Sequence, residues 1–235
     1  MTRIRSASLE ILQRTYATTL LLETVSEELE SRTYNLAEEI LWRRILVADE
    51  IVVISPSEKK HNFWKRIVPE CFIYEQDDTD TLQAIERFTK LHQLEETTLG
   101  KRKRRLLVWD HLPIDRTKHA SLLSMLNNGR CVGMSLLLLL RSRWVLPPEL
   151  IVNVDFKIRA FPGREFSFLI EMPEERRMTY TPPDLQSTLD YRPFWRHREH
   201  QHMWDVYQQD FLLPLLQSVL QSCLPPPLVR MVASY

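Results

Sequence analysis

The sequence predicts a three-layer α/β domain in which helices cover both faces of a mainly parallel sheet. Apolar runs without polar alternation, which are typical of strands buried on both faces, occur at residues 51–54, 106–109 and 136–140. Helical patterns lie before and between these runs. This alternation favours parallel strands, because two parallel strands must be joined by a crossover connection, usually a helix.

The amino-terminal part is expected to supply strands and helices to this domain. Short strands are predicted at residues 9–12, 51–54 and 72–74, and helices at residues 18–29, 31–45 and 79–94. The helix at 18–29 is predicted because Leu20, Leu21, Val25 and Leu29 recur at helical spacing. The helix at 79–94 opens with acidic residues that favour a helix start.

The second half is expected to complete the sheet and then to change character. Strands are predicted at residues 106–109, 136–140, 152–158 and 166–170, with a helix at 115–127. Residues 1–171 would thus form one α/β domain. Proline pairs and an apolar helical stretch near residues 211–220 predict that residues 172–235 are a carboxyl-terminal extension, a linker plus an amphipathic helix.

Composition gives no global indication of a nucleic-acid or membrane partner. Among 235 residues, Lys+Arg and Asp+Glu both number 31, so the formal net charge is zero. The three cysteines form no CxxC pair, which favours a reducing compartment. No secretory signal is visible, and the longest apolar run is far below the ~20 residues of a membrane span. We therefore expect an intracellular protein without a membrane partner, in the cytoplasm or nucleus of a host cell or in a virion.

Four segments occur in an order that is informative as a set. They read IVVISPS at residues 51–57, LLVWDH at 106–111, NNGRCVGMS at 127–135, and LPPELIVNVD at 146–155 after the apolar strand 136–140. Together they resemble the HerA/FtsK-type genome-packaging ATPases of large double-stranded DNA viruses (the poxvirus type), over about residues 8–160. The resemblance implies a RecA-like P-loop NTPase fold, ATP with magnesium as cofactors, double-stranded DNA as substrate, and assembly into a ring.

The phosphate-binding loop of that family, GxxxxGK[ST], has only a degenerate counterpart here. No glycine precedes Gly100, and the best match is ILQRTYAT at residues 11–18. In this alignment Tyr16 replaces the second glycine and Ala17 replaces the lysine, while Thr18 keeps a hydroxyl for magnesium. Glycines let backbone N–H groups converge on phosphate, and the lysine neutralises its oxygens, so this counterpart would lack both.

The resemblance also assigns roles to four other residues. Asp110 stands at the end of the metal-binding strand, and His111 replaces the second acidic residue, which orients the attacking water. Arg141 stands where the family has a strand-end glutamine that senses the γ-phosphate. Arg130, in the Asn-Gly-Arg turn, matches the residue that would act as an arginine finger towards another subunit. Gly129 is expected to end the preceding helix in the left-handed conformation.

These changes predict an ATPase-like protein that has lost catalysis and needs no cofactor. It would act as a structural, regulatory or DNA-binding partner in genome packaging, with packaging or capsid proteins as partners, and it could form a homo-oligomer. Two alternatives stay open: an active DNA-packaging ATPase that binds ATP and magnesium in a non-standard or composite site, and a virion-associated scaffold or adaptor.

Two further clusters are candidate binding residues. The basic run Lys101, Arg102, Lys103, Arg104 and Arg105 fits a DNA-phosphate patch, a nuclear import signal or a solvated strand edge. The segment at residues 195–204 contains three histidines between two tryptophans. It lacks a cysteine or acidic partner at ligand spacing, so a surface or interface segment is favoured over a metal site.

Overall fold

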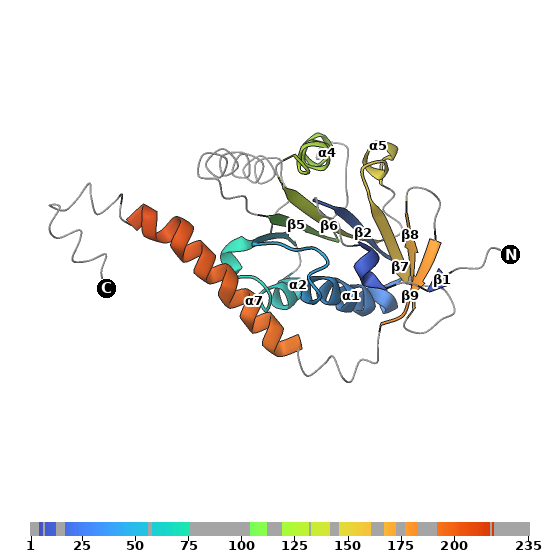
Figure 1. The fold of residues 1–235 in the computed structure, drawn as a ribbon, viewed down its shortest axis with the longest axis horizontal. Helices are drawn as coiled ribbons and strands as arrows, with labels where there is room; N and C mark the ends of the chain where they lie inside the picture. The colour runs from blue at the N-terminus through green and yellow to red at the C-terminus, as the bar shows by residue number, and fades with distance from the viewer. Residues whose placement is uncertain are drawn as a thin grey trace.

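A computed structural model describes the fold at residues 5–6, 8–12, 17–55, 58–75, 104–111, 119–131, 133–141, 146–160, 167–172, 177–182, 192–216 and 218. Its centre is a sheet of nine strands in the order β1-β9-β8-β7-β2-β6-β5-β3-β4 (Figure 1). The predicted α/β class, with a mainly parallel P-loop NTPase-like sheet, is confirmed.

The parallel core of the sheet has β2 (Thr19–Thr24) at its centre. On one side β2 pairs with β6 (Met134–Arg141), which leads through β5 (Arg105–Asp110) and β3 (Glu50–Ile54) to β4 (Ile73–Tyr74) at the edge. On the other side β2 pairs in parallel with β7 (Phe156–Ala160). All six of these parallel strands therefore end at the same edge of the sheet.

Three strands extend the sheet beyond β7. β8 (Phe168–Glu171) is antiparallel to β7, and β9 (Arg177–Tyr180) is antiparallel to β8. The short β1 (Arg5–Ser6) then pairs in parallel with β9. The sheet thus continues past residue 171, and β9, which lies in the predicted extension, belongs to the α/β fold. The domain division at residue 171 itself stays a prediction.

Helices cover both faces of the sheet (Figure 1). α1 (Glu30–Trp42), α2 (Glu58–Trp64) and α7 (Arg192–Tyr207) lie on one face, and α4 (His119–Asn128) and α5 (Pro148–Ile151) lie on the other. The two faces have separate hydrophobic cores because alternate side chains of each strand point to opposite sides. In β6, for example, Leu137 and Leu139 pack on the α1 side, whereas Leu136 and Leu138 pack on the α4 side.

The prediction of a helix at residues 18–29 is wrong. Residues Thr19–Thr24 form the central strand β2, and only the 3₁₀ turn Glu27–Leu29 precedes α1. The four residues from Thr19 to Leu22 are all buried, because β6 and β7 flank the strand and helices cover its faces. A short apolar run fits either a helix or a buried strand, so its spacing was not decisive.

The other predicted elements agree with the structure to different degrees. The strands predicted at 51–54, 72–74, 106–109, 136–140 and 166–170 and the helices at 31–45 and 115–127 are confirmed with shifted ends. Residues Leu9–Leu12 form a 3₁₀ helix instead of a strand, a second 3₁₀ turn spans Glu70–Phe72, and a π-helical turn (Gln208–Leu212) follows α7. β7 begins at Phe156 because the proline-led turn of α5 occupies residues 148–151. The predicted helix 79–94 lies outside the described residues.

Candidate functional site

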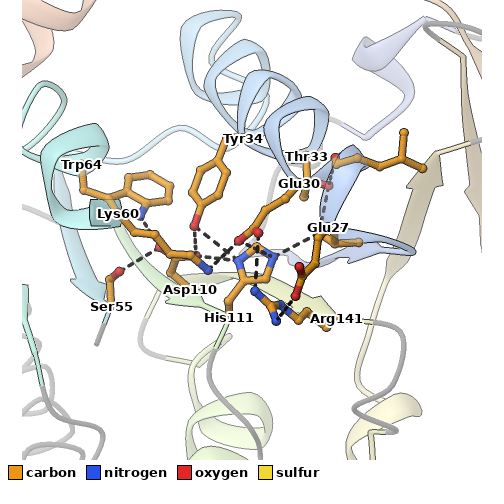
Figure 2. Close-up of polar contacts among 12 residues, drawn as sticks. Glu27, Glu30, Thr33, Tyr34, Ser55, Lys60, Trp64, Asp110, His111 and Arg141 are labelled. Atoms are coloured by element: carbon orange, nitrogen blue, oxygen red, sulfur yellow. Dashed lines mark hydrogen bonds and ion pairs between the residues drawn. The ribbon is translucent and has the colours of Figure 1, made fainter. Parts of the chain in front are cut away.

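The candidate site lies where four parallel strands end. Thr24 ends β2, Ser55 follows β3, Asp110 ends β5, and Arg141 ends β6. In open α/β sheets this carboxyl edge is where ligands bind. Side chains from the first turns of α1 and from α2 reach into the same place (Figure 2). The structure therefore brings Asp110, His111 and Arg141 together, as the resemblance implied.

Asp110 is the centre of the polar cluster and is completely buried. One carboxylate oxygen accepts hydrogen bonds from Ser55 Oγ at 2.9 Å and from the indole N–H of Trp64 at 2.7 Å. The other accepts from the Tyr34 hydroxyl at 2.6 Å and pairs with His111 Nδ1 at 2.8 Å (Figure 2). Four groups of this chain thus hydrogen-bond to the Asp110 carboxylate. A carboxylate that binds a metal ion would need an oxygen that the ion can reach.

These hydrogen bonds determine the charge state of the cluster. Burial by itself would raise the pKa of Asp110, but the hydrogen bonds from His111, Tyr34 and Trp64 outweigh it and hold that pKa below its ordinary value. Burial and the neighbouring Asp110 carboxylate raise the pKa of Tyr34 far above its usual range. Tyr34 is therefore a permanent hydrogen-bond donor to an ionised Asp110.

His111 is held between Asp110 and the end of β2. Its backbone has φ 52°, in the left-handed region that a non-glycine residue rarely adopts. Its Nδ1 pairs with Asp110, and its Nε2 lies 3.1 Å from Thr24 Oγ1. Tyr34 stacks on the imidazole, with ring centroids 5.5 Å apart. The strained backbone is compensated by these contacts, which fix the ring against the strand ends.

The order Thr24–His111–Asp110 matches the nucleophile, base and carboxylate of a hydrolytic triad, but the threonine is not available. Its hydroxyl donates to Thr33 Oγ1 at 2.9 Å. Only 3% of Thr24 and 5% of His111 is exposed. A substrate carbonyl could not reach the hydroxyl, so the arrangement is structural in this conformation.

Next to His111, an ion-pair network closes the site. Glu30, the first residue of α1, pairs with Lys60 Nζ at 2.7 Å and with an Arg141 nitrogen at 3.5 Å. Arg141 also contacts Glu27 at 3.2 Å. Burial tends to raise the pKa of Glu30, but Lys60, His111 and Arg141 outweigh it and lower that pKa. Lys60 and Arg141, the two cations of this network among the described residues, are therefore already paired with carboxylates of the chain (Figure 2).

The loop between β2 and α1 joins the central strand to the helix that follows, so it is the segment to compare with a phosphate loop. The eight residues from Thr24 to Ser31 read TVSEELES. When they are aligned with GxxxxGK[ST], Leu29 stands at the second glycine, Glu30 at the lysine and Ser31 at the hydroxyl residue. The loop contains neither glycine nor lysine, and Ser31 is exposed.

The structure places the end of the segment 11–18, which the sequence aligns with the phosphate loop, away from Asp110 and Arg141. Ala17 and Thr18 precede β2, at the amino edge of the sheet and opposite the site. Thr18 is 3% exposed, and its backbone N–H donates to Ser135 Oγ at 3.1 Å. Tyr16 lies outside the described residues. The alignment assumed a helix at residues 18–29, whereas Thr19–Thr24 form β2.

Arg130 also lies at the amino edge, in the turn between α4 and β6. Its guanidinium donates to Asp155 at 2.9 Å and to the Asn153 carbonyl at 3.0 Å. Asp155 also accepts from the backbone N–H of Thr19 at 2.8 Å. The arginine and the carboxylate thus join the starts of β2 and β7 within one chain. A role towards another subunit stays a prediction.

Gly129 is needed for space and not for a left-handed backbone. Its N–H donates to the Met125 carbonyl at 2.7 Å and closes α4. A Cβ at this position would lie 2.3 Å from that same carbonyl oxygen. The glycine with positive φ is Gly133, at 72°, so the prediction for Gly129 was right about the helix end and wrong about its conformation.

The basic run is only partly described, and its last member is not available to DNA. Arg105 lies in β5 and is 3% exposed, and its Nε donates to Glu50 at 2.8 Å. Arg104 is more exposed and lies beside Asp49, whose carboxylate accepts from the Arg104 backbone N–H at 2.9 Å. Lys101, Arg102 and Lys103 lie outside the described residues, so their DNA role stays a prediction.

Several site residues were missed from the sequence, namely Thr24, Glu30, Thr33, Tyr34, Ser55, Lys60 and Trp64. Ser55 carried a usable signal, since it follows a predicted buried strand directly. The residues of α1 carried none, because their position depends on β2 being a strand.

Comparisons with known proteins support the fold. No family model matches the sequence, and no curated protein does. Among solved structures, EssC (ATPases 2 and 3) from Geobacillus thermodenitrificans has a TM-score of 0.53 at 12% identity, over 82% of this chain and 45% of that one. The cytoplasmic domain of the type VII secretion ATPase EccC from Thermomonospora curvata has 0.50 at 11% identity, over 72% and 24%. B204, the DNA-packaging ATPase of Sulfolobus turreted icosahedral virus, has 0.48 at 13% identity, over 71% and 98%.

The similarities to EssC and EccC support the α/β fold. The chain spans less than half the length of the EssC and EccC chains that it matches. Among the described residues, no helix has both the length and the apolar character that crossing a bilayer requires.

Proposed function

We propose that this chain is an ATPase-fold protein whose nucleotide site is closed by its own side chains. It would serve as a structural, regulatory or DNA-binding partner in packaging a double-stranded DNA genome. The observation that carries the proposal is Glu30, a carboxylate in the register of the phosphate-loop lysine.

A carboxylate at this position reverses the electrostatics of a phosphate site. The lysine of a phosphate loop neutralises the β- and γ-phosphate oxygens, and backbone N–H groups of a glycine-rich turn surround them. Here Glu27 and Glu30 would face those oxygens, and Leu29 replaces the glycine that lets the backbone approach. Nucleotide binding would thus bring like charges together at a place where the cations are already neutralised.

The cations of the site form ion pairs with carboxylates of the chain. Lys60 and Arg141 contact Glu30, whose side chain is 19% exposed, so a phosphate would have to displace a partly buried carboxylate from two partners. Breaking such pairs costs more than breaking surface pairs, because the freed charges stay poorly solvated. The magnesium partner expected in the family, Asp110, is also fully hydrogen-bonded.

The packaging context rests on the four ordered sequence segments, and double-stranded DNA and packaging or capsid proteins remain the proposed partners. Binding of a duplex to the full chain, measured across a series of salt concentrations, tests the DNA part. Alanine replacement of Lys101, Arg102 and Lys103 should reduce the salt slope if that run contacts phosphates. An unchanged slope would remove the run from the DNA interface.

A nucleotide-binding measurement tests the closed site directly. Calorimetric titration of the full chain with ATP and magnesium should give no binding tighter than about 1 mM, and DNA should stimulate no hydrolysis. A Glu30→Gln variant, purified in parallel, controls for contaminating ATPase, because a contaminant does not depend on this residue. Magnesium-dependent turnover that changes with Glu30→Gln, or that is lost in a folded Asp110→Asn protein, would support the active-enzyme alternative instead.

A further inference from the structure

A second polar region lies away from the strand ends, between the turn after α2 and the first half of α7. Here a pocket of about 500 Å³ is lined by Lys65, Arg66, Arg196, His197 and His200. All five side chains are basic or imidazole, and no carboxylate is among the described residues that line it. The protein as a whole has zero net charge, so this pocket is a local concentration of positive charge.

The carboxylates near this pocket leave part of its charge unneutralised. Glu38, on α1, pairs with Arg196, and Glu70 pairs with Lys65 at 2.6 Å where both side chains are largely exposed. An exposed pair of this kind is weak in water. Arg66 is exposed and has no carboxylate partner among the described residues. Within the described part of the chain, the Arg66 guanidinium is therefore not neutralised by a carboxylate.

Arg196 lines the pocket and is held in place by contacts with α1 and α2. Its guanidinium pairs with Glu38, which is 1% exposed, and its charged carbon lies 5.5 Å from the ring centre of Phe63. These contacts hold α7 against α1 and α2. Because His197 and His200 are three residues apart on α7 and line the same pocket, the imidazoles are positioned by the same packing.

We propose that this pocket binds a phosphate-class oxyanion. Guanidinium groups match the geometry of phosphate oxygens and form charge-assisted hydrogen bonds with them, and imidazole N–H groups add further donors. A metal ion is disfavoured, because Lys65 and Arg66 would repel it. The pocket has room for more than one phosphate group, so a ligand with several linked phosphates fits it, either as a free polyphosphate or as part of a nucleic-acid strand. The proposal does not depend on the closed nucleotide site.

The residues divide into an anchor and a binding set. Arg196 is an anchor, and replacing it would disturb the packing of α7. Arg66 and His200 are the residues to test, because neither has a described partner whose loss would unfold the protein. Arg198 is a matched control, since it lies on the same helix outside this pocket, is about half exposed and pairs with Glu199 at 3.1 Å.

The experiment titrates the full chain with inorganic tripolyphosphate and, separately, with a single-stranded DNA oligonucleotide, by calorimetry at low salt. We expect Arg66→Gln to weaken binding about tenfold, the equivalent of one charge-assisted contact, and His200→Gln to weaken it several-fold. Arg198→Gln should change it less than twofold, and circular dichroism should show all three variants folded.

The two probes separate the sources of the phosphate. If tripolyphosphate binds and its binding depends on Arg66, a free polyanion is sufficient to fill the pocket. Binding of the oligonucleotide alone, with the same dependence on Arg66, identifies a polymer strand as the source. The proposal is overturned if neither probe binds, or if Arg66→Gln and Arg198→Gln weaken binding equally.

Discussion

The sharpest consequence of the structure concerns Asp110, whose replacement by asparagine should destabilise the fold. Asparagine keeps the shape but exchanges one acceptor oxygen for an NH₂ donor. Two orientations are available. If the NH₂ group faces Ser55 and Trp64, the indole cannot accept and one buried N–H is left unsatisfied. If it faces Tyr34 and His111, the hydroxyl must rotate and the imidazole must give up its Nδ1 proton.

The size of the effect follows from the hydrogen bonds that are lost. Hydrogen bonds to a charged group contribute about 1.5–3 kcal/mol each, and two of the four are disrupted in either orientation. Reorientation of a hydroxyl recovers part of this. We therefore expect the free energy of unfolding to fall by about 2–4 kcal/mol, a large share of the total of about 5–15 kcal/mol for a domain.

Urea denaturation followed by circular dichroism measures this change. With a slope of about 2–3 kcal/mol per molar, the midpoint should fall by about 1–2 M. Asp205→Asn is the matched control, because Asp205 is exposed on α7 and accepts a hydrogen bond from the neighbouring Gln201 at 2.8 Å. The free energy of unfolding of Asp205→Asn should differ from that of the parent by no more than about 0.5 kcal/mol.

The opposite result would refute the structural role of Asp110. Catalytic groups are often held in arrangements that cost stability, so replacing them leaves the midpoint unchanged or raises it. An Asp110→Asn protein as stable as its parent would thus show that the carboxylate is not stabilised by its four partners. It would favour a site that is kept for a metal ion.

Three further predictions follow from buried contacts. The difference in unfolding free energy between the parent and Asp110→Asn, large at pH 7, should shrink in urea titrations as the pH falls below about 4. A carboxyl whose pKa is lowered by folding loses its contribution to stability as the pH falls through its pKa in the folded protein. A difference that is constant down to pH 2 would contradict this. Gly129→Ala should lower the free energy of unfolding by about 2–3 kcal/mol, because its Cβ would lie 2.3 Å from the Met125 carbonyl oxygen. Thermal denaturation measures this change, and an unchanged midpoint would show that the turn can relax. Arg105→Met should cost about 3–5 kcal/mol by removing the guanidinium that pairs with the buried Glu50 carboxylate. The double change with Glu50→Leu should restore most of this, and equal losses in the single and double variants would exclude the ion pair as the cause.

The sequence was most informative where strands are buried on both faces. The runs in β5 and β6 contain no polar alternation, and the structure buries nearly every residue in them. The ends of these runs therefore placed Asp110 and Arg141 correctly on one edge of a parallel sheet. The Asn-Gly-Arg turn was also located correctly, although its arginine contacts Asp155 of the same chain.

What the sequence alone determined is the α/β class and the residues at the ends of its unmistakable strands. The tertiary structure decided the rest, because the stretch Thr19–Leu22 fits a helix as well as a strand, and only pairing with β6 and β7 buries it as a strand. That pairing makes residues 24–31 the loop before α1 and so places Glu30 against Lys60 and Arg141. The physical reason is that hydrogen bonds between distant strands, and not local spacing, determine which short apolar run lies at the centre of a sheet.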